Sequence, residues 1–261
     1  MVKSLHLAVA AAACAMSAIG CAQAASASTF IFDTTSKTDS TTTSKNFASK
    51  ATDGSSTLNM RVTAWHATDV LFNTNKDTIS SAQLGLYTPG IGVMASNDSY
   101  SGNEHQIDNL DGVDFVMLQF SQNVTLASIS RTVFQLDKIS PSDSDAAYWA
   151  DTKGAISTAA NWNTAVDMTQ YSVDESLWTR VAGGSSASVT AVSPNVTASV
   201  WLVGADFLGT RNDGFKLSGL SVTTPTVASV PEPASWATML AGFGVIGGAV
   251  RRRKALATAR A

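Results

Sequence analysis

Apolar and polar positions follow different patterns at the ends and in the middle of the chain. Continuous apolar runs occupy residues 5–19 and 234–250, whereas the runs between them are short and separated by Gly, Ser, Asn and Asp. Long apolar runs at chain ends are typical of targeting segments and are set aside before the fold is predicted. Short runs bounded by turn-forming residues indicate β-strands in the central region.

The central region predicts many short strands. Residues 58–65 alternate apolar and polar positions, and residues 113–120 and 123–130, separated by a polar turn, predict a hairpin. Only residues 155–171 are ambiguous between helix and loop. Further strand candidates are 131–136, 177–181, 198–203 and 215–222. We therefore expect a mainly β fold, an antiparallel β-sandwich or jelly-roll-like domain.

The N-terminus predicts an export signal. Lys3 precedes the apolar run, and an Ala-x-Ala cleavage pattern ends at Ala24. We expect residues 1–24 to be a signal peptide, which the export translocase engages and signal peptidase removes before Ala25. Two alternatives stay open, because the run could be kept as a membrane helix or Cys21 could become a lipidated N-terminus.

The C-terminus combines a short motif, an apolar run and a cluster of cations. Pro231-Glu232-Pro233 precedes residues 234–250, which would measure about 25 Å as a helix. That length is at the short end of a membrane span, so we expect a transmembrane helix with the domain facing outward. The stop-transfer cations follow this run: Arg251, Arg252, Arg253 and Lys254.

This tail resembles the PEP-CTERM sorting signal of Gram-negative, biofilm-forming bacteria. The resemblance rests on Pro231-Glu232-Pro233, the Gly-containing apolar run and the terminal cations. It implies recognition by an exosortase, an integral-membrane enzyme similar to cysteine transpeptidases. A precursor anchored in the inner membrane would then be cut and moved to the cell surface, the outer membrane or the extracellular matrix. The alternative is an ordinary anchor that is never cut.

Four parts are expected along the chain. The signal peptide is followed by a Ser/Thr-rich segment at 25–55, a β-sandwich surface domain at 56–224 and the sorting tail at 225–261. Nine of the eleven residues from 34 to 44 are Ser or Thr. Such a segment has little apolar surface to bury, which predicts a flexible or irregular stretch.

The exported domain also resembles a family of exosortase-dependent surface proteins, over residues 62–222. The resemblance rests on a His-x-x-Asp-Asn element at 105–109, on Asp143-Ser144-Asp145 after the predicted hairpin, and on the residues that begin at Asp213. It implies a location at the cell surface and no particular chemistry.

Composition narrows the functional classes. Only 14% of the residues are charged, and in the exported part acidic residues outnumber basic ones without a basic stripe. We therefore expect no nucleic-acid partner. Cys14 and Cys21 are the only cysteines and both lie in the leader. The exported domain is thus expected to have no thiol nucleophile, no cysteine metal site and no disulfide.

An acidic loop is the candidate metal site. Oxygen ligands crowd residues 97–111, and hard cations such as Ca²⁺ take six to eight of them. The candidate ligands are Asp98, Glu104, Asp108 and Asp111. The alternative is that these side chains only close turns. No other cofactor is expected.

Histidines and aromatic residues offer weaker signals. His66 and His105 lack the close spacing of a zinc motif. His105 lacks the sequence context of a catalytic triad and is expected to form a hydrogen bond within a loop. Tyr148-Trp149, beside the acidic residues at 143 and 145, could stack on a sugar, whereas Trp65 and Trp201 are expected in the core.

We therefore expect a non-enzymatic structural or interaction protein of the surface or of a biofilm polysaccharide matrix. One alternative is a calcium-assisted carbohydrate-binding module, and another is a secreted hydrolase. Extracellular polysaccharide is the expected partner beside the exosortase.

Overall fold

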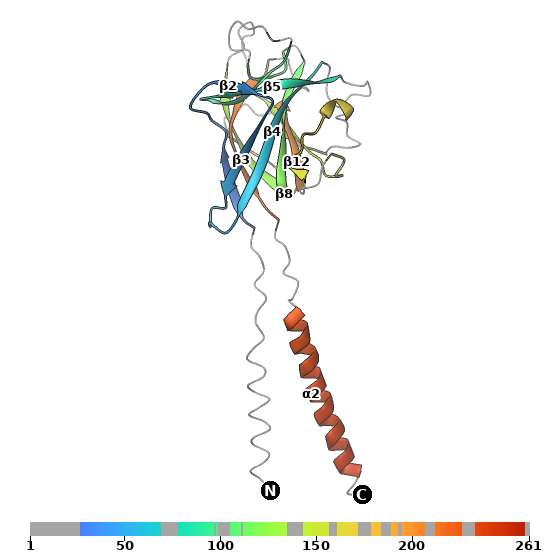
Figure 1. Ribbon diagram of the computed structural model, residues 1–261. Helices are drawn as coiled ribbons and strands as arrows, with labels where there is room; N and C mark the ends of the chain where they lie inside the picture. Colours follow the sequence, from blue (N-terminus) through green and yellow to red (C-terminus); the bar gives the residue numbers. More distant parts are fainter. Residues whose placement is uncertain are drawn as a thin grey trace. The chain divides into compact units, whose positions relative to one another are not determined.

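The computed structural model describes residues 27–68, 78–96, 98, 105–110, 112–134, 143–156, 161–171, 179–183, 189–192, 195–206, 212–225 and 233–258. Contacts within the chain separate a compact unit, Ala27–Pro225, from a second unit that contains helix α2 (Pro233–Thr258). The first unit is rich in strands (Figure 1).

Antiparallel pairing joins all strands of the first unit that the structure describes. The strands are β1 (Thr29–Asp33), β2 (Ser40–Thr42), β3 (Ser44–Lys50), β4 (Thr57–Ala67), β5 (Ile79–Tyr87), β6 (Gly90–Met94), β7 (Ile107–Asp108), β8 (Val113–Val133), β9 (Ala146–Ala150), β10 (Thr179–Gly183), β11 (Val189–Ala191), β12 (Ala198–Ala205) and β13 (Gly214–Thr223). The mainly β prediction is therefore confirmed.

Five of these strands form a closed ring. The order β13-β6-β5-β4-β8 returns to β13, because β8 pairs with both β4 and β13. β12, β9 and β10 extend the sheet from β8. A sandwich needs two stacked sheets that are not joined around a closed circuit, so the expected sandwich or jelly roll is corrected to a ring with added strands.

β8 is the strand that closes the ring. Its first half pairs with β4 and β12, and its second half pairs with β13. The predicted hairpin is wrong, because the chain continues through 121–123 in the same direction. Ala198 of β12 pairs with Val124 of β8, and Val200 of β12 pairs with Gln119 of β8. β8 therefore has more residues than β12 between these two pairs, and its extra polar residues form a bulge and not a turn that reverses the chain.

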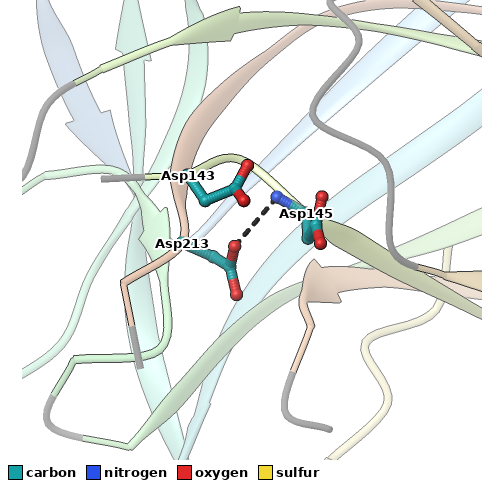
Figure 2. Close-up of side chains that lie close together, drawn as sticks. All are labelled: Asp143, Asp145 and Asp213. Atoms are coloured by element: carbon teal, nitrogen blue, oxygen red, sulfur yellow. Dashed lines mark hydrogen bonds between the residues drawn. The ribbon is translucent and has the colours of Figure 1, made fainter. Parts of the chain in front are cut away.

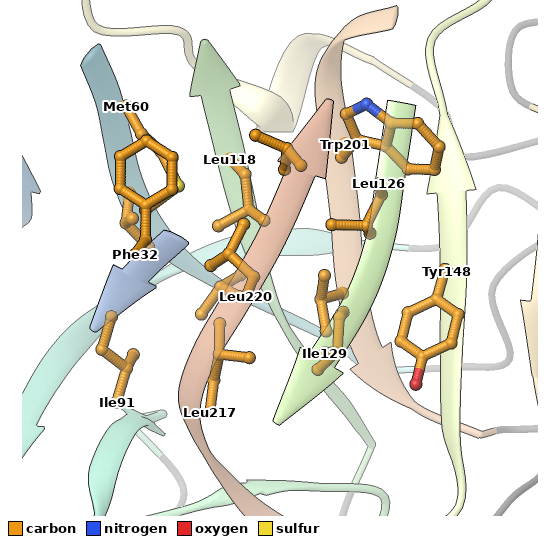
Figure 3. Packing of buried hydrophobic residues seen from close by; sticks show 14 of the residues in the cluster. Phe32, Met60, Ile91, Leu118, Leu126, Ile129, Tyr148, Trp201, Leu217 and Leu220 are labelled. Atoms are coloured by element: carbon orange, nitrogen blue, oxygen red, sulfur yellow. The ribbon is translucent and has the colours of Figure 1, made fainter. Parts of the chain in front are cut away.

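The main core lies on one face of these strands. Figure 3 shows the packing of buried side chains from several strands, among them Phe32, Leu118, Leu126, Trp201 and Leu220. Phe32 meets Phe120 edge to face, with ring centroids 5.9 Å apart. Each fully buried side chain of this kind contributes roughly 1.5–3 kcal/mol by leaving water. The expected burial of Trp201 is confirmed.

A second apolar cluster covers the opposite face of β4, β8, β9 and β12. Alternate residues of these strands point there, including Trp65, Phe115 and Trp149. Ile156 and, from the described residues 161–171, Val166, Met168 and Tyr171 pack over them. The described part of this segment includes a short 3-10 turn, Met168–Gln170. Strands buried on both faces explain why their apolar runs are nearly continuous.

The Ser/Thr-rich segment takes part in the sheet. β1 pairs with β13, β2 pairs with β5, and β3 pairs with β4 over its whole length. Residues 34–39 lie between strands, but Ser40–Thr42 form β2 and Ser44 begins β3. The prediction that residues 34–44 are flexible or irregular is therefore wrong for their second half, because pairing with β5 and β4 orders it. Alternate residues of β1 are buried and exposed, so Phe30 and Phe32 bring apolar side chains that the Ser/Thr count conceals.

Helix α2 begins at Pro233, a favoured residue for a first helical turn. Within the described part of the chain, no helix combines the length and apolar character that crossing a membrane requires. The expected transmembrane helix at 234–250 is corrected accordingly. Glycines at 242, 244, 247 and 248 and polar residues at 235 and 238 dilute its apolar side chains.

Candidate functional site

Three aspartates meet where β9 and β13 begin. Asp143 and Asp145 precede β9, and Asp213 precedes β13. Oxygen atoms of the three carboxylates lie within 4.8 Å of one another (Figure 2). Among the described residues, this trio and not the predicted acidic loop is the group of three carboxylates that the fold brings together.

Hydrogen bonds hold Asp213 at the centre of the trio. Asp145 N donates to Asp213 Oδ1 at 2.9 Å, as Figure 2 shows, and Asn109 Nδ2 donates to Asp213 Oδ2 at 2.7 Å. Asp213 N in turn donates to Asn109 Oδ1 at 3.0 Å. Asp143 also bridges to Asp213 through the backbone. The arrangement fastens the end of β7 to the starts of β9 and β13.

A buried arginine lies beside the acidic trio. Arg131 Nη1 donates to the backbone oxygen of Ser144, and its guanidinium lies 5.3 Å from the centroid of the Phe215 ring. Burial lowers the pKa of Arg131, while the negative charges of Asp145 and Asp213 oppose that shift. A cation within the fold therefore balances part of the trio's negative charge.

Burial makes two of the three carboxyl groups harder to ionise. Burial, followed by the charges of Asp143 and Asp206, raises the pKa of Asp145. Burial raises the pKa of Asp213 to about 7, although hydrogen bonds from Asp145 and Asn109 oppose the shift. The trio thus takes up a proton near neutral pH. Its oxygen atoms also suit a hard cation, but both Asp213 oxygens already accept hydrogen bonds.

The predicted calcium loop is only partly within the described residues. Glu104 and Asp111 lie outside them. Asp98 Oδ2 accepts a hydrogen bond from Ala95 N at 2.6 Å, and Asp108 Oδ1 accepts one from Leu110 N at 3.1 Å. Such bonds close turns. The calcium site in this loop stays a prediction.

Both histidines have positions that the sequence did not indicate. His66 is buried on β4 opposite Asp114 of β8, with His66 Nδ1 2.8 Å from Asp114 Oδ1. Burial, then the charge of Asp98, raises the pKa of Asp114. Gly112 has φ +143°, and a Cβ there would lie 2.4 Å from His66 Cε1, so the site requires glycine. His66 therefore lies within strand β4.

His105 stacks on Tyr87, with ring centroids 6.2 Å apart. Its backbone oxygen accepts a hydrogen bond from Lys216 Nζ. Lys216 also lies 4.4 Å from the Tyr87 ring centroid, and burial lowers the pKa of its amine to about 8.

The suggested sugar-stacking pair is wrong. Tyr148 packs into the main core and Trp149 into the second cluster, both essentially without exposed surface. In the sequence, Asp143 and Asp145 stand beside this pair and belong, with Asp213, to the elements that resemble surface proteins, but no local pattern predicts that the three carboxylates meet. That resemblance was the available signal that these positions matter, because it includes all three aspartates.

The sorting tail exposes a hydrophobic helix. Leu240, Phe243 and Val245 each leave more than half of their surface uncovered. Pro231 and Glu232, like the signal cleavage residues Ala24 and Ala25, lie outside the described residues. α2 continues past 250 through the four cations, whose stop-transfer role stays a prediction.

Comparison with protein families matches residues 229–254 to the PEP-CTERM protein-sorting motif. The match lies at the C-terminus, contains Pro231-Glu232-Pro233 and ends at Lys254. Exosortase recognises this motif, which implies an exported protein that is processed at the membrane. Comparison of the chain with curated proteins gives no matching relative.

Proposed function

We propose that this protein is a non-enzymatic structural or interaction protein of the cell surface or the biofilm polysaccharide matrix of a Gram-negative bacterium. An exosortase reads Pro231-Glu232-Pro233 and cuts the tail. The translocase and signal peptidase process the N-terminal leader first. The observation that carries the proposal is the PEP-CTERM match at residues 229–254.

The exported unit supports an interaction role over catalysis. Asp213 of the acidic trio accepts hydrogen bonds from the backbone of Asp145 and from Asn109, so the trio has a structural role in holding strands together. His66 and Asp114 are both buried, so they do not present an acid and a base to a substrate. The exposed apolar side chains of α2 suit an apolar environment at the site where the membrane enzyme acts.

Replacing Pro231, Glu232 and Pro233 together by Ala tests the reading of the motif. The variant changes only the motif, so it should be exported and remain uncut at the membrane. Deleting the host exosortase should have the same effect. Immunoblots of cell fractions with an antibody against the exported unit measure both the size and the location of the product. Normal processing of the triple variant would refute the exosortase assignment.

Two further variants distinguish recognition of the Pro-Glu-Pro motif from the role of the four cations in localisation. Pro225→Ala changes a proline outside the matched residues and should be processed normally. Replacing Arg251, Arg252, Arg253 and Lys254 by Ala removes their attraction to anionic lipid headgroups, about 1 kcal/mol for each cation. That variant should be released or mislocalised and should not accumulate as an uncut inner-membrane form.

A further inference from the structure

A groove lies on the outer face of the sheet, where β4 and β5 pass beneath one edge of residues 156–171. It encloses about 570 Å³, within the range of small-molecule sites. Six side chains characterise its walls: Arg61, Thr63, Trp65, Gln83, Met94 and Val166. All of them belong to the described residues of the β-rich unit.

The covering segment reaches β5 through its 3-10 turn, Met168–Gln170, and Ala165 and Val166 just before this turn line the groove. On β4, residues 58, 60, 62 and 64 face the main core, which leaves 61, 63 and 65 for the opposite face. Met168 and Tyr171 cover that face over the neighbouring strands, whereas Val166 marks the groove wall. Hydrogen bonds fix the wall in place, from Gln119 Nε2 to Thr164 O at 3.2 Å and from Asn46 Nδ2 to Asn163 Oδ1 at 2.9 Å.

Arg61 gives the groove a positive charge. Its guanidinium has five N–H donors. Nη1 donates to the backbone oxygen of Asn163 over a long distance, 3.4 Å. Nε is buried without an acceptor in the described part of the chain. None of the described lining residues is Asp or Glu. Because Nε is buried, the donors that an anion entering the groove can reach are those of the two Nη groups.

The rest of the lining favours a hydroxylated ligand. Hydroxyl and amide groups come from Thr43, Ser81, Gln83 and Ser96, and Ser81 and Gln83 are exposed. Met94 and the edge of Trp65 provide apolar surface between these groups. A guanidinium binds a carboxylate through two parallel hydrogen bonds, and hydroxyl and amide groups pair with hydroxyl groups. A sugar that carries a carboxylate has both features.

We infer that this groove binds a carboxylate-bearing oligosaccharide, with Arg61 binding the carboxylate and the surrounding hydroxyl and amide groups binding the sugar hydroxyls. The inference rests on the proposed function for the source of the ligand, an acidic polysaccharide outside the cell. The groove itself is independent of the tail.

Calorimetry on the purified full-length chain tests this inference. The probe is trigalacturonate, and its methyl ester is the matched neutral compound. Trigalacturonate should bind, the ester should bind at least about tenfold more weakly, and acetate should not compete at equal concentration. Equal binding of the ester, or full competition by acetate, would overturn the acidic-sugar assignment.

Variants place the binding in the groove. Arg61→Gln should weaken trigalacturonate binding at least about tenfold, because it removes the charged hydrogen bonds. Arg180→Gln removes the same charge from an exposed strand position outside the lining and should stay within about twofold. Gln83→Trp keeps Arg61 but fills the groove from an exposed position, and it should also abolish binding.

Thermal unfolding of each variant verifies that it is folded. Undiminished binding by folded Arg61→Gln or folded Gln83→Trp would refute the inference, as would no binding of trigalacturonate at millimolar concentration. Those results would leave the tail experiment unaffected, since processing is measured in cells. Normal processing of the tail variant would in turn leave the binding measurement intact.

Discussion

Asp213 shows how the fold changes the chemistry of one residue. Its side chain is almost completely buried, beside two other carboxylates and two hydrogen-bond donors. Burial raises its pKa from 3.8 to about 7. The folded state therefore holds a proton that the unfolded state releases at lower pH. As a result, this group lowers the stability of the fold as pH rises from about 4 to 7.

Replacing Asp213 with Asn should reduce that pH dependence. The amide mimics the protonated carboxyl, so the free energy of unfolding should fall less steeply between pH 5 and 8 than in the wild-type protein. Some slope should remain, because the pKa values of Asp145 and Asp114 are also raised. Urea unfolding across this pH range measures the slope, whatever the offset in absolute stability.

Asp53→Asn is the matched control for this experiment. Hydrogen bonds from Ser55 lower the pKa of Asp53, so it stays ionised throughout the range. Its replacement should leave the slope unchanged. An unchanged slope in Asp213→Asn would mean that Asp213 is ionised in the folded protein at pH 5.

The segment that contains Ile156 and residues 161–171 is held in place by packing and not by regular secondary structure. The segment has almost no regular structure in its described part, yet it covers one face of four strands. Met168 is fully buried in the second cluster. Asp167 fixes the turn before it by accepting hydrogen bonds from Thr169 N at 3.0 Å and from Thr169 Oγ1 at 2.7 Å. Tertiary packing therefore holds a segment that its local sequence does not make regular.

Met168→Ala should destabilise the fold by about 2–5 kcal/mol, because it removes buried methylene groups and leaves a cavity. Gln170→Ala changes an exposed residue of the same turn and should stay within about 0.5 kcal/mol of the wild-type value. Chemical denaturation of both variants measures the difference. A loss as small as that of the control would show that residues 156–171 pack loosely on the sheet.

At the scale of the whole molecule, the chain separates a β-rich unit from its targeting ends. The unit spans Ala27–Pro225, close to the expected mature start at Ala25. The C-terminal motif at 229–254 begins directly after it. The sorting motif therefore lies outside the unit that holds the described strands.

Mass spectrometry of the exported protein should place its N-terminus at Ala25, because signal peptidase selects small residues such as those before this bond. Replacing Ala24 with a bulky residue such as Phe should block cleavage and retain the leader. A lipid-modified Cys21 at the N-terminus would contradict the prediction and make the protein a lipoprotein.

Local sequence determined the features that depend on neighbouring residues. The strand-rich character follows from short apolar runs between turn formers, and the sorting tail follows from a motif, an apolar run and cations in fixed order. Strands at 58–65, 198–203 and 215–222 lie within or close to β4, β12 and β13. The apolar content of α2 was overestimated, because glycines do not add hydrophobicity.

Only the tertiary structure decided which segments meet. β8 passes through its polar residues because β4, β12 and β13 pair with its two halves, and no local pattern specifies those partners. The acidic trio joins Asp145 to Asp213 across 68 positions, and Asn109 reaches Asp213 across 104. The groove at Arg61 likewise depends on Ala165 and Val166, which lie about a hundred positions away in the sequence and line it together with β4 and β5. Pairing over such separations is determined by burial and by closure of the sheet, and neither is encoded in a short window of sequence.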